Sequence, residues 1–233
     1  MGDFYLFANC NFVPDRYNDW QAAYDDLATY VSSSEPTTKS YYFGIPIDYA
    51  HDISKTTSML AFEVYGERED LYKTHLTSPA MSTFLTLIPP TSTTGLDLNH
   101  YALTAGFLDA SHTQAPAAIM QDIRITCVSA SARAALLTSL NALVDSVTPG
   151  EDGTLTYMAF ESLDDGLGAR IFGRWRSRED MEGFVRREGV NAFWMGSKEG
   201  VRAMEQRLYV PNGKGWLHRG SGYPGEKKVD SKI

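Results

Sequence analysis

The chain has 233 residues, of which 43% are hydrophobic and 12% aromatic, so it can bury the core of one large domain or of two small ones. Its formal net charge of −8 argues against nucleic acid or an anionic membrane surface as partner, because phosphate groups are bound by clustered Lys and Arg. The only two cysteines, Cys10 and Cys127, indicate no disulfide framework, and no apolar stretch approaches the roughly 20 residues of a membrane span.

The two ends of the chain bear on its location. Met1-Gly2-Asp3 leads directly into a predicted strand without a signal peptide, so we expect a cytoplasmic protein. The terminal Ser231-Lys232-Ile233 differs by one residue from the peroxisomal Ser-Lys-Leu tail, which leaves a peroxisomal address as the alternative.

Residues 1–110 predict a strand, a helix, two strands, a helix and a strand. Apolar alternation indicates the first strand, and Trp20, Tyr24, Leu27 and Val31 then recur at helical spacing. Ser78-Pro79 suits a helix start, with Ser as N-cap and Pro at the first helical position. The predicted strands cover residues 4–13, 40–47, 58–65 and 101–108.

Residues 118–219 predict the same order a second time. The linker is expected at 111–117 and a polar, mobile tail at 220–233. Ser177 with Asp180 three residues later resembles a capping box for a helix after the third strand. The predicted strands cover residues 119–128, 154–161, 167–175 and 214–219.

The two halves also repeat in sequence. Residues 62–71 and 172–181 share Phe62 and Phe172, an aromatic at Tyr65 and Trp175, and the run Arg-Glu-Asp. Each half reads β-α-β-β-α-β, the ferredoxin-like order, whose helices cover only one sheet face. Because the other face must also be buried, we expect an α+β protein in which two ferredoxin-like repeats pack sheet to sheet as an intramolecular dimeric α+β barrel.

The first half carries a pattern that points to a family. Glu63-Val64-Tyr65 at a strand end, His75 on the following helix and Ser78 shortly after resemble the signature of the antibiotic biosynthesis monooxygenase family. Gly173, Val185 and Glu188 replace Glu63, His75 and Ser78 in the second half, which we expect to be a degenerate repeat. The resemblance implies a dimeric α+β barrel, and it implies chemistry loosely, because members oxidise phenolic polyketides with oxygen and no cofactor, act as lyases or isomerases, degrade haem, or have no known role.

Strand alternation predicts which side chains face the barrel lumen. Tyr5, Phe7, Asn9 and Asn11 share one face, and Asp122, Arg124 and Thr126 lie on the equivalent face of the second half. Buried polar groups need partners, so this row predicts a ligand site. The alternative is a structural pair between Asp122 and Arg124.

His75 and Asp122, the latter tuned by Arg124, are the candidate catalytic bases. A histidine has the pKa range needed to remove a phenolic proton, although a core histidine is the alternative at position 75. Tyr65 and Trp175 are candidate aromatic walls of the substrate site, with core packing as the alternative. The basic cluster formed by Arg170, Arg174, Arg176 and Arg178 is expected on a solvated sheet face or at a helix start.

No cofactor or metal is indicated, since no Gly-x-Gly-x-x-Gly follows a strand and no metal-ligand spacing is present. We therefore expect a cofactor-independent tailoring monooxygenase that deprotonates a phenolic, polyketide-like substrate and reacts it with O2 in the lumen. The alternatives are an isomerase, cyclase, dehydratase or decarboxylase in the same pocket, or a non-catalytic binding module. The chain would act as a monomer through its internal pairing, or as a homodimer.

Overall fold

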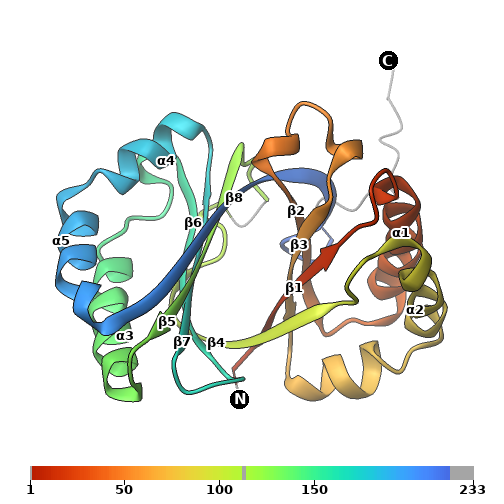
Figure 1. Cartoon of the computed structure of the whole chain (residues 1–233), viewed down its shortest axis with the longest axis horizontal. Helices are drawn as coiled ribbons and strands as arrows, with labels where there is room; N and C mark the ends of the chain where they lie inside the picture. Colours follow the sequence, from red (N-terminus) through yellow and green to blue (C-terminus); the bar gives the residue numbers. More distant parts are fainter. Residues whose placement is uncertain (1, 112–113, 221–233) are drawn as a thin grey trace.

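Eight antiparallel strands close into one barrel, and helices cover it on two opposite sides (Figure 1). The computed structural model describes residues 2–111 and 114–220. The strand order around the barrel is β1-β3-β2-β8-β5-β7-β6-β4. The predicted α+β fold of two ferredoxin-like halves packed sheet to sheet is confirmed. The predicted tail, with Ser231-Lys232-Ile233, lies outside the described residues.

The first half supplies four strands and two long helices. Helices α1 and α2 pack together on the outer face of its strands (Figure 1). Ser78 caps α2 as predicted, because its hydroxyl accepts a hydrogen bond from the Met81 N–H at 3.0 Å. The elements are β1 (Phe4–Asn11), α1 (Tyr17–Ser34), β2 (Thr38–Pro46), β3 (Ser58–Tyr65), the π-helix η3 (Asp70–His75), α2 (Pro79–Thr91) and β4 (Asp97–Phe107), with short 3₁₀ turns η1 (Ile47–Tyr49) and η2 (Ile53–Lys55).

The second half repeats the order with a different set of helices. Ser177 caps α4 as predicted, since its hydroxyl accepts from the Asp180 N–H at 3.0 Å. The elements are β5 (Ile119–Cys127), α3 (Ala130–Asp145), η4 (Glu151–Gly153), β6 (Thr154–Ser162), β7 (Gly168–Trp175), α4 (Arg178–Val185), α5 (Glu188–Ser197), η5 (Lys198–Gly200) and β8 (Val201–Trp216). None of the described helices is long and apolar enough to cross a membrane.

Two strands join the halves. β4 pairs with β1 of its own half and with β6 of the other, and β8 pairs with β5 and with β2. A strand that pairs with both halves must be long, and β8 spans Val201–Trp216 where the sequence predicted a strand only over 214–219. Its first part pairs with β5 alone. Residues 202–207 there are exposed and largely polar, so they show no strand pattern in the sequence.

The barrel interior is packed with aromatic rings. Phe7, Phe62, Phe160 and Phe172 lie with ring centroids 4.8 to 5.7 Å apart. The alternation prediction is confirmed for Tyr5 and Phe7, which face inward, and the residues on the opposite faces of β1 and β5 pack against the helices. The expected open lumen at the centre is wrong, because these rings fill it.

Two arginines complete the interior. Arg170 and Arg174 are fully buried, so the prediction of a solvated face is wrong for these two. Both oxygens of Asp122 accept from Arg170, at 2.5 and 2.7 Å, and the guanidinium lies 3.8 Å from the Phe7 ring centroid. Arg174 donates to the Ala115 carbonyl oxygen at 2.7 Å. Each charge is therefore neutralised or hydrogen-bonded inside an aromatic core.

Candidate active site between the first sheet and its helices

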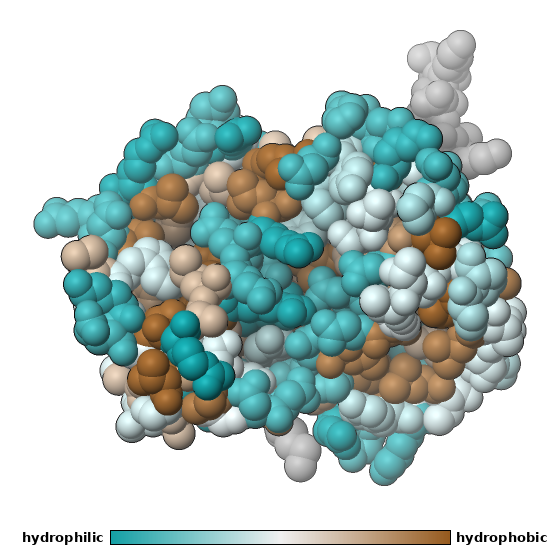
Figure 2. All heavy atoms as spheres, viewed as in Figure 1, coloured by the Kyte–Doolittle hydropathy of each residue, from teal (hydrophilic) through white to brown (hydrophobic). Residues whose placement is uncertain are grey.

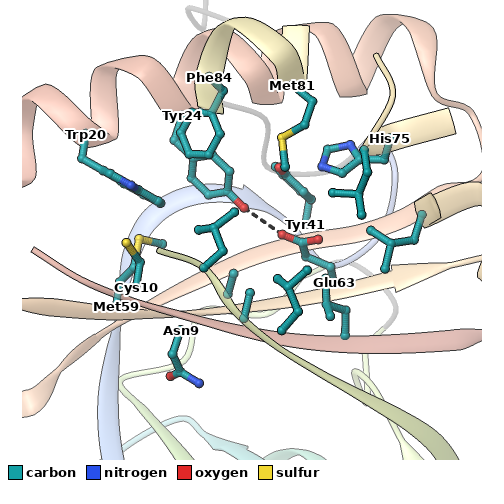
Figure 3. Close-up of a pocket in the computed structure, with 17 residues that line it drawn as sticks. Asn9, Cys10, Trp20, Tyr24, Tyr41, Met59, Glu63, His75, Met81 and Phe84 are labelled. Atoms are coloured by element: carbon teal, nitrogen blue, oxygen red, sulfur yellow. Dashed lines mark hydrogen bonds between the residues drawn. The ribbon is translucent and has the colours of Figure 1, made fainter. Parts of the chain in front are cut away.

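A small pocket lies between the outer face of β1, β2 and β3 and the helices α1 and α2 (Figure 3). Its volume is about 30 Å³, enough for a water molecule. Binding of an aromatic ring therefore requires the lining side chains to move, and Met59 and Met81 are unbranched and adaptable. The lining is mostly apolar, with polar side chains from Tyr24, Tyr41, Glu63, His75 and the predicted site residue Asn9, which also lines the cavity at the barrel mouth.

Glu63 is the carboxylate of this pocket. It stands on β3 between Phe62 and Val64, which face the barrel interior, so alternation turns it toward the helices. The Tyr24 hydroxyl donates to Oε1 at 2.7 Å and the Tyr65 hydroxyl donates to Oε2 at 2.7 Å. Burial raises the pKa of Glu63, although His75 and the two hydroxyls act in the opposite direction.

His75 ends the π-helix η3 and is held by a second buried carboxylate. Its Nδ1 lies 2.9 Å from Oε2 of Glu35, the residue that follows α1, and both side chains are at most 3% exposed. A carboxylate at this distance places the imidazole proton on Nδ1. Nε2 is then the nitrogen that can accept a proton from a ligand in the pocket.

Three tyrosines surround the acids. Burial raises the pKa values of Tyr24, Tyr41 and Tyr65 well above the ordinary value, so all three keep their protons at neutral pH, and Tyr24 and Tyr65 donate theirs to Glu63. The Tyr41 and Tyr65 rings lie 5.9 and 5.8 Å from the His75 ring. Two phenolic hydroxyls thus donate to the Glu63 carboxylate, in the same pocket as the His75 ring.

The structure separates residues that the sequence placed in one site. His75 lies on the helix side of the first sheet, whereas Asp122 is on the barrel side of β5. The prediction that His75, Asp122 and Arg124 share one lumen site is therefore wrong. Side-chain alternation assigns a residue to one of two faces, but it does not tell which face holds a cavity.

The predicted aromatic walls are also placed differently. Tyr65 faces the helices and donates to Glu63, so it lies in the core behind the pocket and not in the barrel interior with Tyr5 and Phe7. Trp175 packs against Tyr157 and Phe184 in the second helix-side core, so its assignment to the same site is wrong. Phe7 is fully buried among rings and cannot contact a ligand in this arrangement.

The polar row of β1 and β5 forms a second cavity, of about 160 Å³, at one mouth of the barrel. Figure 2 shows hydrophilic residues gathered between the two groups of helices. Arg124 lies 3.6 Å from Asp97, so the expected pair of Asp122 with Arg124 does not form. Thr126 lies farther along β5 and does not line this cavity. The lining residues are Asn9, Asn11, Ser58, Asp97, Asp122, Arg124, Glu205, Arg207 and Tyr209.

The sequence-based site lacked three polar residues that line the helix-side pocket, Tyr24, Tyr41 and Glu63, and it lacked Glu35, which pairs with His75. Glu63 had a readable signal, because a single acid inside the apolar strand Met59–Tyr65 must find buried partners. Glu35 had none, since it follows a run of serines at a helix end and reads as a solvated residue. Within the described ranges, no three His, Cys, Asp or Glu side chains converge as a metal site requires.

The equivalent place in the second half is filled. Gly173 stands where the first half has Glu63, and a Cβ added there would lie 2.2 Å from the Trp175 ring. Val185, the counterpart of His75, packs against the same core. A carboxylate and a histidine are therefore replaced by an indole ring and an apolar side chain.

A family model matches part of the chain. The family model "Antibiotic biosynthesis monooxygenase" matches residues 118–194, in the second half, whereas the motif residues of the resemblance lie in the first. A search of curated proteins finds no match.

Solved structures match along the whole chain. A proposed monooxygenase of Fusobacterium nucleatum has a TM-score of 0.72 at 11% identity, covering 97% of this chain and 99% of its own. One from Lactobacillus acidophilus has a TM-score of 0.71 at 10% identity, covering 91% and 94%. A structure described as an anthrone oxidase-like protein has a TM-score of 0.67 at 12% identity, covering 97% and 98%. At these identities the likeness shows a common fold, a barrel of two halves, and the antibiotic biosynthesis monooxygenase model matches part of the second half.

Proposed function

We propose that this protein is a cofactor-independent monooxygenase that oxidises a phenolic aromatic small molecule in the pocket between the first sheet and helices α1 and α2. The observation that carries the proposal is the buried Glu35–His75 pair beside Glu63 in an otherwise apolar pocket. Such a pair supplies a general base whose protonated form is stabilised by a neighbouring carboxylate.

The first step is a proton transfer. His75 accepts the proton of a substrate hydroxyl or of an acidic C–H group at Nε2, while Nδ1–H donates to Glu35. The resulting imidazolium pairs with Glu35, and its charge also interacts favourably with the Glu63 carboxylate in the same pocket. The hydroxyls of Tyr24 and Tyr65 hold Glu63 in place during this change.

The second step is the reaction with oxygen. The substrate carbanion transfers an electron to O2, and the two radicals combine to form a carbon–oxygen bond. The peroxide takes up the proton from His75 and loses water, which leaves a carbonyl on the carbon that was oxidised. For an anthrone, one O2 is consumed, one oxygen atom becomes the quinone carbonyl, and the other leaves as water with the two hydrogens of that carbon. No external reductant is needed.

Anthrone is the first substrate to test, because one structure of the same fold is described as anthrone oxidase-like. That likeness supports the choice of probe, and the chemistry of the pocket supports the reaction. The barrel mouth that includes Asn11 and Arg124 is strongly polar, so its lining suits a three-ring apolar molecule less well than the mostly apolar helix-side pocket does once that pocket has opened.

The test is oxygen uptake by the purified chain with anthrone and without added cofactor. We expect uptake equal to the quinone formed, and a loss of about 10²- to 10⁴-fold in kcat for His75→Ala. His51→Ala is the matched control, because His51 is exposed in a loop. Turnover under strict anaerobiosis would assign the pocket to an isomerase, cyclase, dehydratase or decarboxylase. Binding of anthrone with no turnover in either condition would make the protein a binding module.

A further inference from the structure

A chain of hydrogen bonds connects the helix that carries His75 to the other half of the molecule. The Tyr72 hydroxyl on η3 lies 2.9 Å from Nε2 of His100 on β4. Nδ1 of His100 lies 2.7 Å from Oδ1 of Asp164, in the loop between β6 and β7. We call these three side chains, Tyr72, His100 and Asp164, the clasp.

The clasp is fixed at its centre. The His100 N–H donates to Oδ2 of Asp164 at 2.8 Å, and the His100 carbonyl oxygen accepts from the Leu163 N–H at 2.9 Å. The imidazole is 13% exposed and stacks on Phe4, with centroids 5.5 Å apart. Asp164 thus places the proton on Nδ1, and Nε2 accepts from the Tyr72 hydroxyl.

The helix η3 is short. It is a single π-turn of six residues, closed by the Leu76 N–H donating to the Leu71 carbonyl oxygen at 2.8 Å. Short π-helices are rare and are frequent at functional sites. Tyr72 and His75 both belong to this turn, so a contact that fixes the Tyr72 ring also restricts the position of His75. The Arg68 guanidinium, 4.3 Å from the Tyr72 ring centroid, covers that ring.

The second half has no equivalent of the clasp. Glu182 stands at the position that corresponds to Tyr72, and it pairs with Arg178 and Arg186 on its own helix at 2.9 and 3.2 Å. The clasp is therefore specific to the half that contains the pocket, although its carboxylate comes from the other half.

We infer that Asp164 and His100 are positioning residues that hold Tyr72, and through it the π-turn, so that His75 is aligned in the pocket. The role of His75 rests on the proposed function, but the alignment itself does not. The second half would thus contribute to the site of the first by fixing the base, without contacting a ligand.

The test measures hydrogen exchange of the Leu76 amide, which reports opening of the π-turn without any substrate. Tyr72→Phe removes one oxygen atom, and Asp164→Asn removes one charge, so both variants keep the shape of the residues. We expect each to accelerate exchange at Leu76 by about tenfold, while the amide of Phe62 in the centre of β3 stays within twofold. Asp152→Asn is the matched control, because Asp152 pairs with Arg187 on the surface of the second half at 2.6 Å.

Two results would overturn the inference. Unchanged exchange at Leu76 in both clasp variants would show that the turn holds itself. Equal acceleration at Leu76 and Phe62 would show general destabilisation. In the anthrone assay, the clasp variants should lower kcat by about tenfold with KM within twofold. If wild-type protein does not oxidise anthrone, the proposed function fails, and the exchange result still decides the clasp.

Discussion

Oε2 of Glu35 lies 2.9 Å from Nδ1 of His75, and both side chains are almost completely buried. Removing the charge of Glu35 should weaken the base without moving it. We expect Glu35→Gln to lower kcat for anthrone oxidation by about 10²-fold or more, because the imidazolium formed on proton transfer loses its stabilising neighbour. Glu199→Gln, on a 90% exposed side chain, is the control. An unchanged kcat in Glu35→Gln would remove Glu35 from the mechanism.

The pKa of Glu63 predicts a pH-dependent stability. Because burial raises it above the unfolded value, the folded state binds more protons between the two pKa values. The contribution of Glu63 to stability is therefore complete below the unfolded pKa and is lost as the pH rises through the folded pKa. We expect the free energy of unfolding of the wild type, relative to Glu63→Gln, to fall as the pH rises above the ordinary glutamate pKa of 4.5. Urea titrations across this range measure the difference, and a relative stability that rises with pH would contradict the assignment.

Asp122 is predicted to act in stability and not in catalysis. Asp122→Asn leaves the guanidinium of Arg170 buried without its anion, which costs about 3–5 kcal/mol. Arg124→Gln breaks only a half-exposed contact of 3.6 Å with Asp97 and should cost less than about 1 kcal/mol. Denaturant unfolding compares the two. Loss of anthrone turnover in folded Asp122→Asn would return the active site to the barrel mouth.

Gly173 should tolerate no side chain. An added Cβ at 173 meets the Trp175 ring at 2.2 Å, whereas one at Gly183 on α4 meets nothing within 4 Å. We expect Gly173→Ala to destabilise by about 1–3 kcal/mol through overpacking, and Gly183→Ala to stabilise by up to about 1 kcal/mol through helix propensity. Thermal unfolding measures both. Adding Trp175→Tyr to Gly173→Ala should recover part of the loss, and no recovery would show that the backbone at 173, and not the indole, sets the limit.

The architecture could be predicted from sequence because it depends on repetition and alternation. The shared pattern around Phe62 and Phe172 indicated two like halves, and the alternation of β1 separated Phe4 from Tyr5 correctly. The same rule, applied to β7, puts Trp175 on the side of Ala169 and Ile171, which are plainly apolar. The misplacement of Trp175 was therefore avoidable.

The site could not be predicted in the same way. Whether a sheet face is filled or hollow depends on the sum of side-chain volumes from several elements, and no single strand contains that information. The sequence indicated that Arg170 and Arg174 are exposed, because an arginine is rarely buried. In the fold Asp122 and Asp109 lie next to them, and these carboxylates offset the free-energy cost of burying the two guanidinium groups. The contact between Glu35 and His75 joins the residue that follows α1 to the last residue of the π-turn η3. Neither the exact end of α1 nor the π-turn can be recognised in the sequence.

The exchange of strands between the halves sets the order in which the protein can fold during synthesis. Tyr41 on β2 pairs with Trp216 at the end of β8, the final strand of the barrel. The first half therefore leaves the ribosome with the edge of β2 unpaired and the rings of Phe7 and Phe62 uncovered. Synthesis proceeds at about 5–20 residues per second, so several seconds pass before the second half emerges. During that interval the nascent chain is a substrate for chaperones, and ordering is completed only when the last strand arrives.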